Sequence, residues 1–380
     1  MKYNFKRNNK KIIRFINLIL KFKYIIRGII YMTITFFDFL QGLINSPGLI
    51  VITILISAVM YTNGSSDIPN SIATCISTRS LDAKKTLIIA IIFNFLGVFL
   101  MTFISSKVAE TILNIANFGD ETSISIIALI SALIGITLWS IITWYFGIPS
   151  SKSHALIAGI SGAAIAIHGD LSGINFKEWG KVIFGLIVVN LSAFLLGYIT
   201  TKLIENICKD MDRRKTNRFF RKTQIIGAAA MSFMNGAQDG QKFMAIILLG
   251  VAFSKNVAST NFVIPIWLII HCSIFIALGA IIGGLRVIKT IGTKVVKVEK
   301  YQGTAADISS AICLFVSTTM GIPVSSTHTK NSAIMGVGAS KRLSNVNWKT
   351  ARNMVLTWIC TFPGCGILGF VLTKILINII

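Results

Sequence analysis

Two short acidic motifs in the sequence combine a carboxylate with amides, hydroxyls and a glycine. The first, NGSSD, ends at Asp67, and the second, NGAQD, ends at Asp239. Oxygen-bearing side chains suit a hard cation such as Na⁺, and Gly64 and Gly236 are expected to break their helices and free backbone carbonyls as ligands. One such motif also fits an Asp that caps a kinked helix, but its recurrence favours a site. The predicted cation ligands are the metal-binding carboxylates Asp67 and Asp239, with Asn63, Asn70, Asn235 and Gln238.

Two further motifs, GIPSSKSH at 147–154 and GIPVSSTH at 321–328, place hydroxyl side chains directly after a proline. Proline favours the first turn of a helix, and the unpaired N–H groups at a helix N-terminus attract anions. Taken singly, a Ser-rich N-cap is more often structural, but a pair of them could face each other around one tetrahedral anion. The predicted anion ligands are Ser150, Ser151, Ser153, Ser325, Ser326 and Thr327.

These motifs recur in the same order at a nearly constant offset. Asp239 lies 239 − 67 = 172 residues after Asp67, and Gly321 lies 321 − 147 = 174 residues after Gly147. The offsets predict a duplicated unit with copies at 47–204 and 223–380. A basic linker, 205–222, joins the copies, and a basic cytoplasmic segment with a first apolar span, 1–46, precedes them.

The composition predicts an all-α, polytopic protein of the plasma membrane. Hydrophobic residues make up 53% of the chain, charged residues 13%, and the mean hydropathy is +0.73. Nearly uncharged stretches long enough for a hydrocarbon layer of about 30 Å occur at 86–106, 123–145, 182–204, 262–284 and 354–380. The net charge of +23 needs no nucleic acid, because the basic residues lie mainly between these stretches, as in cytoplasmic loops. The six dispersed cysteines suggest neither a disulfide framework nor a zinc site, and no cofactor is expected.

Loop charge predicts the orientation of the two copies. The basic linker is expected to be cytoplasmic. If 28–46 crosses outward, 47–78 returns as one broken helix, and the two GIP motifs form re-entrant hairpins, every loop falls on the side that its charge predicts. The second copy then starts on the opposite face from the first. Such inverted-topology repeats are common in secondary transporters, which bind substrate near the bilayer midplane at broken helices.

Over about residues 48–380, the four motifs together resemble those of the inorganic phosphate transporter (Pit) family. The resemblance implies a symporter that imports inorganic phosphate with Na⁺ or H⁺ by alternating access, with Na⁺ as the expected coupling ion. It also implies that the Asp motifs serve cation and substrate binding and that the hydroxyl hairpins hold the anion. Lys242 is predicted as a further substrate-binding residue, which would add positive charge to the pathway.

The sequence departs from the family pattern at several positions. Ser66 and Gln238 replace the family's Asn before each Asp, and Lys152 stands where the second hairpin has Ser326. A buried Lys152 could pair with the substrate, replace a bound cation, or extend to the membrane edge. His154 and His328 match the family and are expected to form hydrogen bonds within the hairpins; the alternative is a titrating imidazole that carries protons.

Three alternatives remain open from the sequence. Sulfate is one, because some members of this family carry it; a carboxylate beside the anion would favour phosphate, which has a hydroxyl proton to donate. An anion channel is another, although paired Asp motifs fit alternating access better. Assembly as a homodimer is the third. An enzyme is not expected, because Ser153 and His154 are adjacent and point about 100° apart on a helix, so they form no dyad.

Overall fold

The computed structural model describes residues 34–145, 151–255, 263–291 and 298–379, and nearly all of this chain is helical. The N-terminal segment 1–33 lies outside the described residues, so the predicted first span at 28–46 remains a prediction. The α-helices are α2 (Phe36–Asn45), α3 (Pro47–Ser71), α4 (Ala73–Ser77), α5 (Ala83–Ile104), α6 (Lys107–Leu113), α7 (Thr122–Tyr145), α8 (Lys152–His168), α9 (Phe176–Phe184), α10 (Asn190–Cys208), α11 (Arg213–Ser254), α12 (Ile266–Ile291), α13 (Lys300–Met320), α14 (Ser326–Lys341) and α15 (Trp348–Ile379).

Six of the described helical segments are long and apolar enough to cross a membrane. They are Pro47–Ser71, Ala83–Ile104, Thr122–Thr143, Phe176–Cys208, Ile266–Gly284 and Ala351–Ile379. Large apolar side chains such as Ile54, Ile92 and Ile282 are exposed on these helices, as a surface that faces lipid requires. The predicted polytopic, all-α membrane fold is therefore confirmed.

Helix α3 begins at a capping serine followed by a proline, and it ends two residues after an internal proline. Ser46 caps its N-terminus by accepting the N–H of Leu49, and Pro47 occupies the first turn. The helix contains Pro69 and ends at Ser71; Ile72 then leaves the helical conformation before α4 starts. The predicted broken helix is therefore present in the first copy.

The second copy differs from the expectation, because α11 runs unbroken from Arg213 to Ser254 and passes through Gly236. Gly64 likewise lies inside α3 rather than at its end. Both glycines instead let another backbone approach. A Cβ atom on Gly64 would lie 1.9 Å from the carbonyl oxygen of Ile276, and one on Gly236 would lie 2.1 Å from that of Asn94. The prediction that these glycines break their helices was wrong, because close packing explains them.

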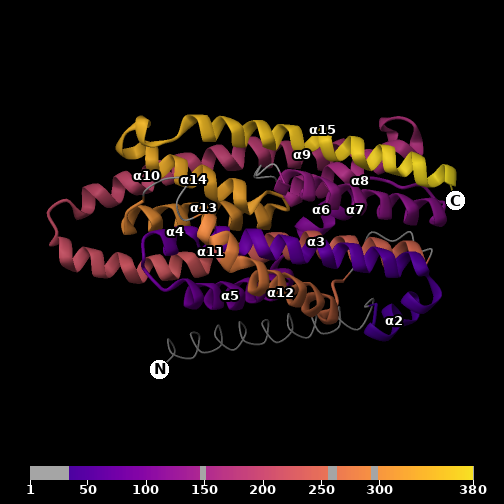
Figure 1. The fold of residues 1–380 in the computed structure, drawn as a ribbon, viewed down its shortest axis with the longest axis horizontal. Coiled ribbons are helices and arrows are strands. Elements are labelled where there is room, and N and C mark those ends of the chain that lie inside the picture. The colour runs from indigo at the N-terminus through magenta and orange to yellow at the C-terminus, as the bar shows by residue number, and fades with distance from the viewer. Residues whose placement is uncertain (1–33, 146–150, 256–262, 292–297, 380) are drawn as a thin grey trace, which may run out of the picture.

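The two copies run in opposite directions. At the C-terminal end of α11, Lys255 pairs with Asp38 of α2 at 3.3 Å, beside the start of α3. Near the N-terminal end of α11, Arg221 donates to the carbonyl of Ser80, which follows α3 and α4, at 2.9 Å. Helices α3 and α11 are therefore antiparallel, as Figure 1 shows at the centre of the molecule. This arrangement is the inverted repeat that loop charge predicts.

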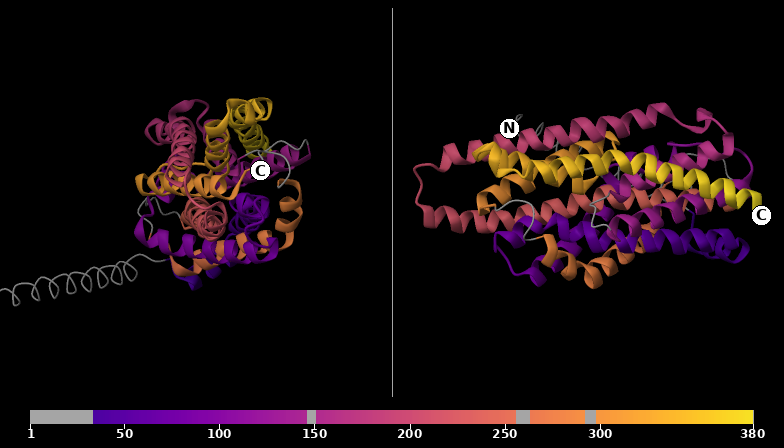
Figure 2. Two further views of the ribbon diagram at one scale, coloured as in Figure 1. Left: turned by 90° about the vertical axis from the view of Figure 1, so that its left-hand side faces the viewer. Right: turned by 45° about the horizontal axis from the view of Figure 1, so that its top comes forward.

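The copies also exchange packing partners across the interface. Helix α3 packs mainly on α12 and α11 on α5, while α8 packs on α15 and α14 on α10. The end-on and tilted views in Figure 2 show these helices bundled around the central pair. Each of these pairs crosses at glycines that would place a Cβ between 1.8 and 2.5 Å from a facing carbonyl oxygen: Gly64 and Gly279, Gly97 and Gly236, Gly162 and Gly369, and Gly197 and Gly336.

Each hydroxyl motif lies between two helices. Helices α13 and α14 are joined by a short turn that begins at Gly321, whose φ of +72° suits glycine. Helices α7 and α8 flank the first motif, of which 146–150 lie outside the described residues. That these hairpins re-enter the membrane without crossing it remains a prediction.

Candidate functional site

The helices that follow the two hydroxyl motifs start beside each other. Ser151 caps α8 by accepting the N–H of His154 at 3.3 Å, and Ser325 caps α14 by accepting the N–H of His328 at 3.4 Å. The two imidazole rings lie 4.9 Å apart between centroids. The positive ends of two helix dipoles therefore meet between the copies.

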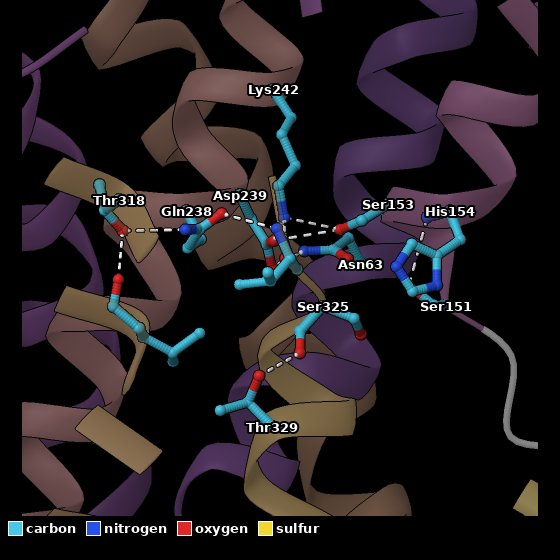
Figure 3. A network of polar contacts seen from close by, with 12 residues as sticks. Asn63, Ser151, Ser153, His154, Gln238, Asp239, Lys242, Thr318, Ser325 and Thr329 are labelled. Atoms are coloured by element: carbon cyan, nitrogen blue, oxygen red, sulfur yellow. Dashed lines mark hydrogen bonds and ion pairs between the residues drawn. The ribbon is translucent and has the colours of Figure 1, made fainter. Parts of the chain in front are cut away.

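The carboxylate of Asp239 and the ammonium of Lys242 lie at this meeting point (Figure 3). The Asp239 carboxylate accepts from the Asn63 amide at 3.1 Å, from the Ser153 hydroxyl at 3.5 Å and from Lys242 at 3.1 Å. Lys242 also donates to the Ser153 hydroxyl at 2.8 Å and to the carbonyl of Val324 at 2.5 Å. One buried ion pair thus connects α3, α8, α11 and the turn before α14.

The second predicted carboxylate, Asp67, lies beside Lys152, the residue of α8 that comes before Ser153. It accepts from the Ser66 hydroxyl at 2.8 Å and lies 3.8 Å from the ammonium of Lys152, which also donates to Ser66. Both side chains of the ion pair are 12% exposed. Lys152 therefore pairs with a carboxylate inside the protein and does not extend to the membrane edge.

Gln238, predicted as a cation ligand, instead holds the second hairpin. Its amide nitrogen donates to the hydroxyls of Ser317 and Thr318 and to the carbonyl of Ile322, and its oxygen accepts from the N–H of Val324. Figure 3 shows this side chain directed away from Asp239 toward α13. Its contacts position the turn from which Val324 reaches Lys242.

Several buried polar atoms around this network have no hydrogen-bond partner in the described chain. They include the amide oxygens of Asn63 and Asn235, the hydroxyls of Ser326 and Thr327, and the ring nitrogens of His154 and His328. The two histidine rings therefore form none of the expected hydrogen bonds with the described residues, and the His328 ring stacks on Trp358 at 4.0 Å. Buried polar groups without protein partners are the groups that a polar ligand or water would satisfy.

Two predicted ligands contribute less to this network. Ser150 lies outside the described residues. Asn70 is buried in the last turns of α3, and within the described chain its side chain is hydrogen-bonded to neither carboxylate.

The sequence interpretation missed a second buried ion pair, between Asp307 of α13 and Lys330 of α14. Both side chains are 0% exposed. The available signal was a charged residue inside each helix of the second hairpin, since ionisable side chains at membrane depth are functional candidates by default.

The buried charges of the described chain balance. Its buried or nearly buried carboxylates each contact a lysine, in the pairs Asp67–Lys152, Glu178–Lys181, Asp239–Lys242 and Asp307–Lys330. Among the described residues, no group of three or more His, Cys, Asp or Glu side chains could hold a metal ion. Any cation at the site would therefore be held by few carboxylates together with amide, hydroxyl and carbonyl oxygens.

Inverted helical repeats that surround a buried polar site define a polytopic membrane transport protein. Comparison with known proteins identifies the family. Residues 63–369 match the phosphate transporter family. A probable low-affinity inorganic phosphate transporter of Bacillus subtilis (strain 168) is 39% identical over 84% of this chain and 96% of its own length. A protein of the same description from Rhizobium meliloti (strain 1021) is 38% identical over 81% of this chain and 90% of its own length.

The fold also matches a solved structure. The sodium-dependent phosphate transporter superposes with a TM-score of 0.80 over 88% of this chain and 100% of that one, at 21% identity. The chain thus belongs to the phosphate transporter family. It is a multi-pass protein of the plasma membrane and a transporter, not an enzyme.

Proposed function

We propose that this chain is a secondary active symporter that imports inorganic phosphate together with Na⁺ or H⁺. The observation that carries the proposal is the meeting of two helix N-termini, from oppositely directed copies, at the Asp239–Lys242 pair. The names of the relatives, which are phosphate transporters, support the choice of substrate.

The anion is held by groups from both hairpins. Ser326 and Thr327 offer hydroxyls that have no partner among the described residues, and the N-termini of α8 and α14 offer positive dipole ends. Lys242 supplies a charged donor that already reaches Ser153 and Val324. Ser151 and Ser325 act mainly as helix caps and fix the orientation of those N-termini.

Phosphate is favoured over sulfate because an acceptor lies beside the anion groups. The Asp239 carboxylate contacts Ser153 and Lys242, two of the proposed anion ligands. Hydrogen phosphate can donate its hydroxyl proton to this carboxylate. Sulfate has no proton at neutral pH, so its oxygens would repel the carboxylate without donating a hydrogen bond to it.

Charge balance explains why the anion needs a co-transported cation. Because the buried charges of the described protein already cancel, a phosphate anion alone would place uncompensated negative charge in a medium of low dielectric constant. Bound Na⁺ or H⁺ offsets that charge. Asp67, with the unpartnered amide oxygens of Asn63 and Asn235, provides oxygen ligands of the type that fits Na⁺.

The position of the site between the two copies supports alternating access. Its ligands come from α3 and α8 of one copy and α11 and α14 of the other, so movement of one copy against the other would open the site to either side.

The test is uptake of radiolabelled phosphate into proteoliposomes, with Na⁺ and pH gradients imposed separately and with sulfate as competitor. We expect saturable uptake that a cation gradient accelerates and that excess sulfate does not inhibit. Inhibition by sulfate at concentrations similar to phosphate would indicate a sulfate permease. A flux that rises linearly with phosphate concentration and does not change when a Na⁺ or pH gradient is imposed would indicate a channel.

A further inference from the structure

The Asp307–Lys330 pair forms a second polar cluster, distinct from the anion site. The ammonium of Lys330 contacts the Asp307 carboxylate, lies 3.1 Å from the hydroxyl of Thr74 and lies 3.2 Å from the carbonyl of Ser71. The carboxylate also accepts from the Thr74 hydroxyl, at 2.8 Å to the nearer oxygen, and from the amide of Gln224. The ammonium is thus enclosed by three oxygen atoms of different chemical types.

One of these oxygens belongs to a helix end. Ser71 is the last residue of α3, and the helical conformation stops at Ile72. Carbonyls at the C-terminus of a helix lack intrahelical partners and carry the negative end of the dipole. In broken membrane helices such carbonyls coordinate Na⁺ together with carboxylate and hydroxyl oxygens. The oxygens around Lys330 are therefore those of a monovalent-cation site.

The internal repeat shows that the fold does not need this cluster. With the offsets of 172 and 174, the first-copy equivalents of Asp307, Lys330 and Gln224 are Leu133, Leu156 and Ile52, and the second-copy equivalent of Thr74 is Ile246. All four are fully buried members of the apolar core. An apolar core thus serves the same packing role at the symmetry-related position. The Asp307–Lys330 cluster of the second copy places two charges in the interior at a substantial desolvation cost. Packing alone does not explain why the chain has them.

We propose that Asp307, Thr74 and the Ser71 carbonyl form a monovalent-cation site, which the chain fills with its own Lys330 ammonium. The lysine is a tethered substitute for one coupling cation, so this protein needs one Na⁺ fewer per cycle than it would with a neutral residue at 330. The proposal rests on the cation-coupled transport argued above.

The position of Lys330 connects the tethered cation to the anion site. Lys330 lies one turn after Ser326 on α14, the helix whose N-terminus faces the anion. Its partners Ser71, at the end of α3, and Thr74, in α4, come shortly after the Asp67 motif in the chain. Through these two contacts, Lys330 joins the proposed anion-binding helix of one copy to the proposed cation-binding helix of the other.

The test removes the ammonium but keeps the oxygens. In Lys330→Ala, the space left by the side chain admits Na⁺ and water beside an otherwise uncompensated Asp307. We expect the purified variant to melt several degrees higher in NaCl than in choline chloride, a larger shift than the unmodified protein shows. We also expect its phosphate uptake to depend more steeply on Na⁺, by about one further ion per cycle.

The matched control is the double variant Asp307→Asn, Lys330→Met, which keeps both side-chain volumes and removes both charges. Neutral replacement of a buried pair is often tolerated, so its Na⁺ response should equal that of the unmodified protein. If Lys330→Ala folds only when Na⁺ is present throughout purification, the proposal is supported. If it responds to Na⁺ no more than the control, or fails to fold with and without Na⁺ while the control folds, the proposal is overturned.

The melting measurement needs no transport, so it tests the tethered cation independently of the proposed function. Absence of phosphate uptake by the unmodified protein would count against the proposed function only. Normal uptake by the unmodified protein, with no gain of Na⁺ response in Lys330→Ala, would count against the tethered cation only.

Discussion

At the scale of single residues, the two predicted carboxylates differ, because Asp239 has more polar contacts in the described site than Asp67. Its two carboxylate oxygens contact Asn63, Ser153 and Lys242, which come from three different helices. Asp67, by contrast, has polar contacts to two described side chains, those of its neighbour Ser66 and of Lys152. The equivalent carboxylates of the two copies are therefore not interchangeable, and Asp239 is the better place to test the site.

We expect Asp239→Asn to lower coupled phosphate uptake by about a hundredfold or more while the protein still inserts into the membrane. The substitution leaves the buried Lys242 ammonium without its counter-charge, and breaking a buried ion pair costs about 3 to 5 kcal/mol. Initial uptake rates in proteoliposomes measure the effect. The control is Asp210→Asn, because the Asp210 side chain is 87% exposed. Near-normal uptake by Asp239→Asn would remove this carboxylate from the transport site.

Substitution of two neighbouring serines of the second hairpin should separate an effect on protein stability from an effect on phosphate binding. Ser325 caps α14, whereas the Ser326 hydroxyl is buried without a partner in the described chain. We expect Ser325→Ala to cost about 1 kcal/mol of stability through loss of the cap. We expect Ser326→Ala to leave the melting temperature unchanged and to raise the half-saturation concentration for phosphate about fivefold, the value of one hydrogen bond of about 1 kcal/mol.

Melting curves and phosphate titrations of the same two preparations distinguish these effects. If Ser326→Ala had an unchanged half-saturation concentration, the hydroxyl would not contact the anion. If Ser325→Ala melted at the same temperature as the unmodified protein, the cap would contribute nothing measurable to α14.

At the scale of helices, the glycine crossings hold the two copies together. A Cβ atom on Gly336 of α14 would lie 1.9 Å from the carbonyl oxygen of Phe194 in α10, so the two helices would have to separate. Without the hydrophobic effect between helices in lipid, such close packing is a main source of association. The same helix carries Ser326 and Lys330, so this crossing also sets the position of the proposed anion site and of the second ion pair.

We expect Gly336→Ala to destabilise the protein by about 1 to 3 kcal/mol, as overpacking typically does. Gly180→Ala is the matched control, because a Cβ on Gly180 of α9 meets no atom of the described chain within 4 Å. That change should be neutral or stabilising, since alanine favours a helix over glycine by about 1 kcal/mol. Melting temperatures in detergent measure both. Equal melting temperatures for the two variants would mean that α14 and α10 can separate at no cost.

At the scale of the whole molecule, the fold could be predicted from the length of the apolar stretches, the repetition of motifs and the charge of the loops. Apolar length predicted the spans, and the offset between the Asp67 and Asp239 motifs predicted two copies. Loop charge predicted that they are inverted. The sequence also predicted that Asp239, Ser153 and Lys242 belong to one site, although it assigned the two copies equal roles.

What the sequence did not show depends on contacts between distant segments. Nothing near Gln238 indicates that its amide holds the second hairpin, because its partners lie about 80 residues away in α13 and the turn. Gly236 has the sequence of a helix break, but the backbone that approaches it belongs to α5 of the other copy. Asp307 and Lys330 were visible as charges in membrane helices, yet their pairing across 23 residues required the folded hairpin.

The orientation in the membrane is the property of the whole molecule that is simplest to test. The turn at Asp210, between α10 and α11, lies within the basic linker. Asp120 lies in the acidic loop before α7, which is tied to the other end of the long α9–α10 span by a hydrogen bond of 2.8 Å from Asn117 to Gly173. Because basic loops remain in the cytoplasm, these two exposed residues should lie on opposite faces, with Asp120 outside.

We therefore expect a membrane-impermeant maleimide to label Asp120→Cys in intact cells and to label Asp210→Cys only after the cells are permeabilised. Both variants are made with Cys208→Ser, because Cys208 is partly exposed near the same turn, and that parent chain supplies the background signal. The reverse pattern would place the basic linker outside and invert the copies. Labelling of both positions in intact cells would mean that the α9–α10 segment does not cross the membrane, and the inverted repeat could then not carry substrate from one face to the other.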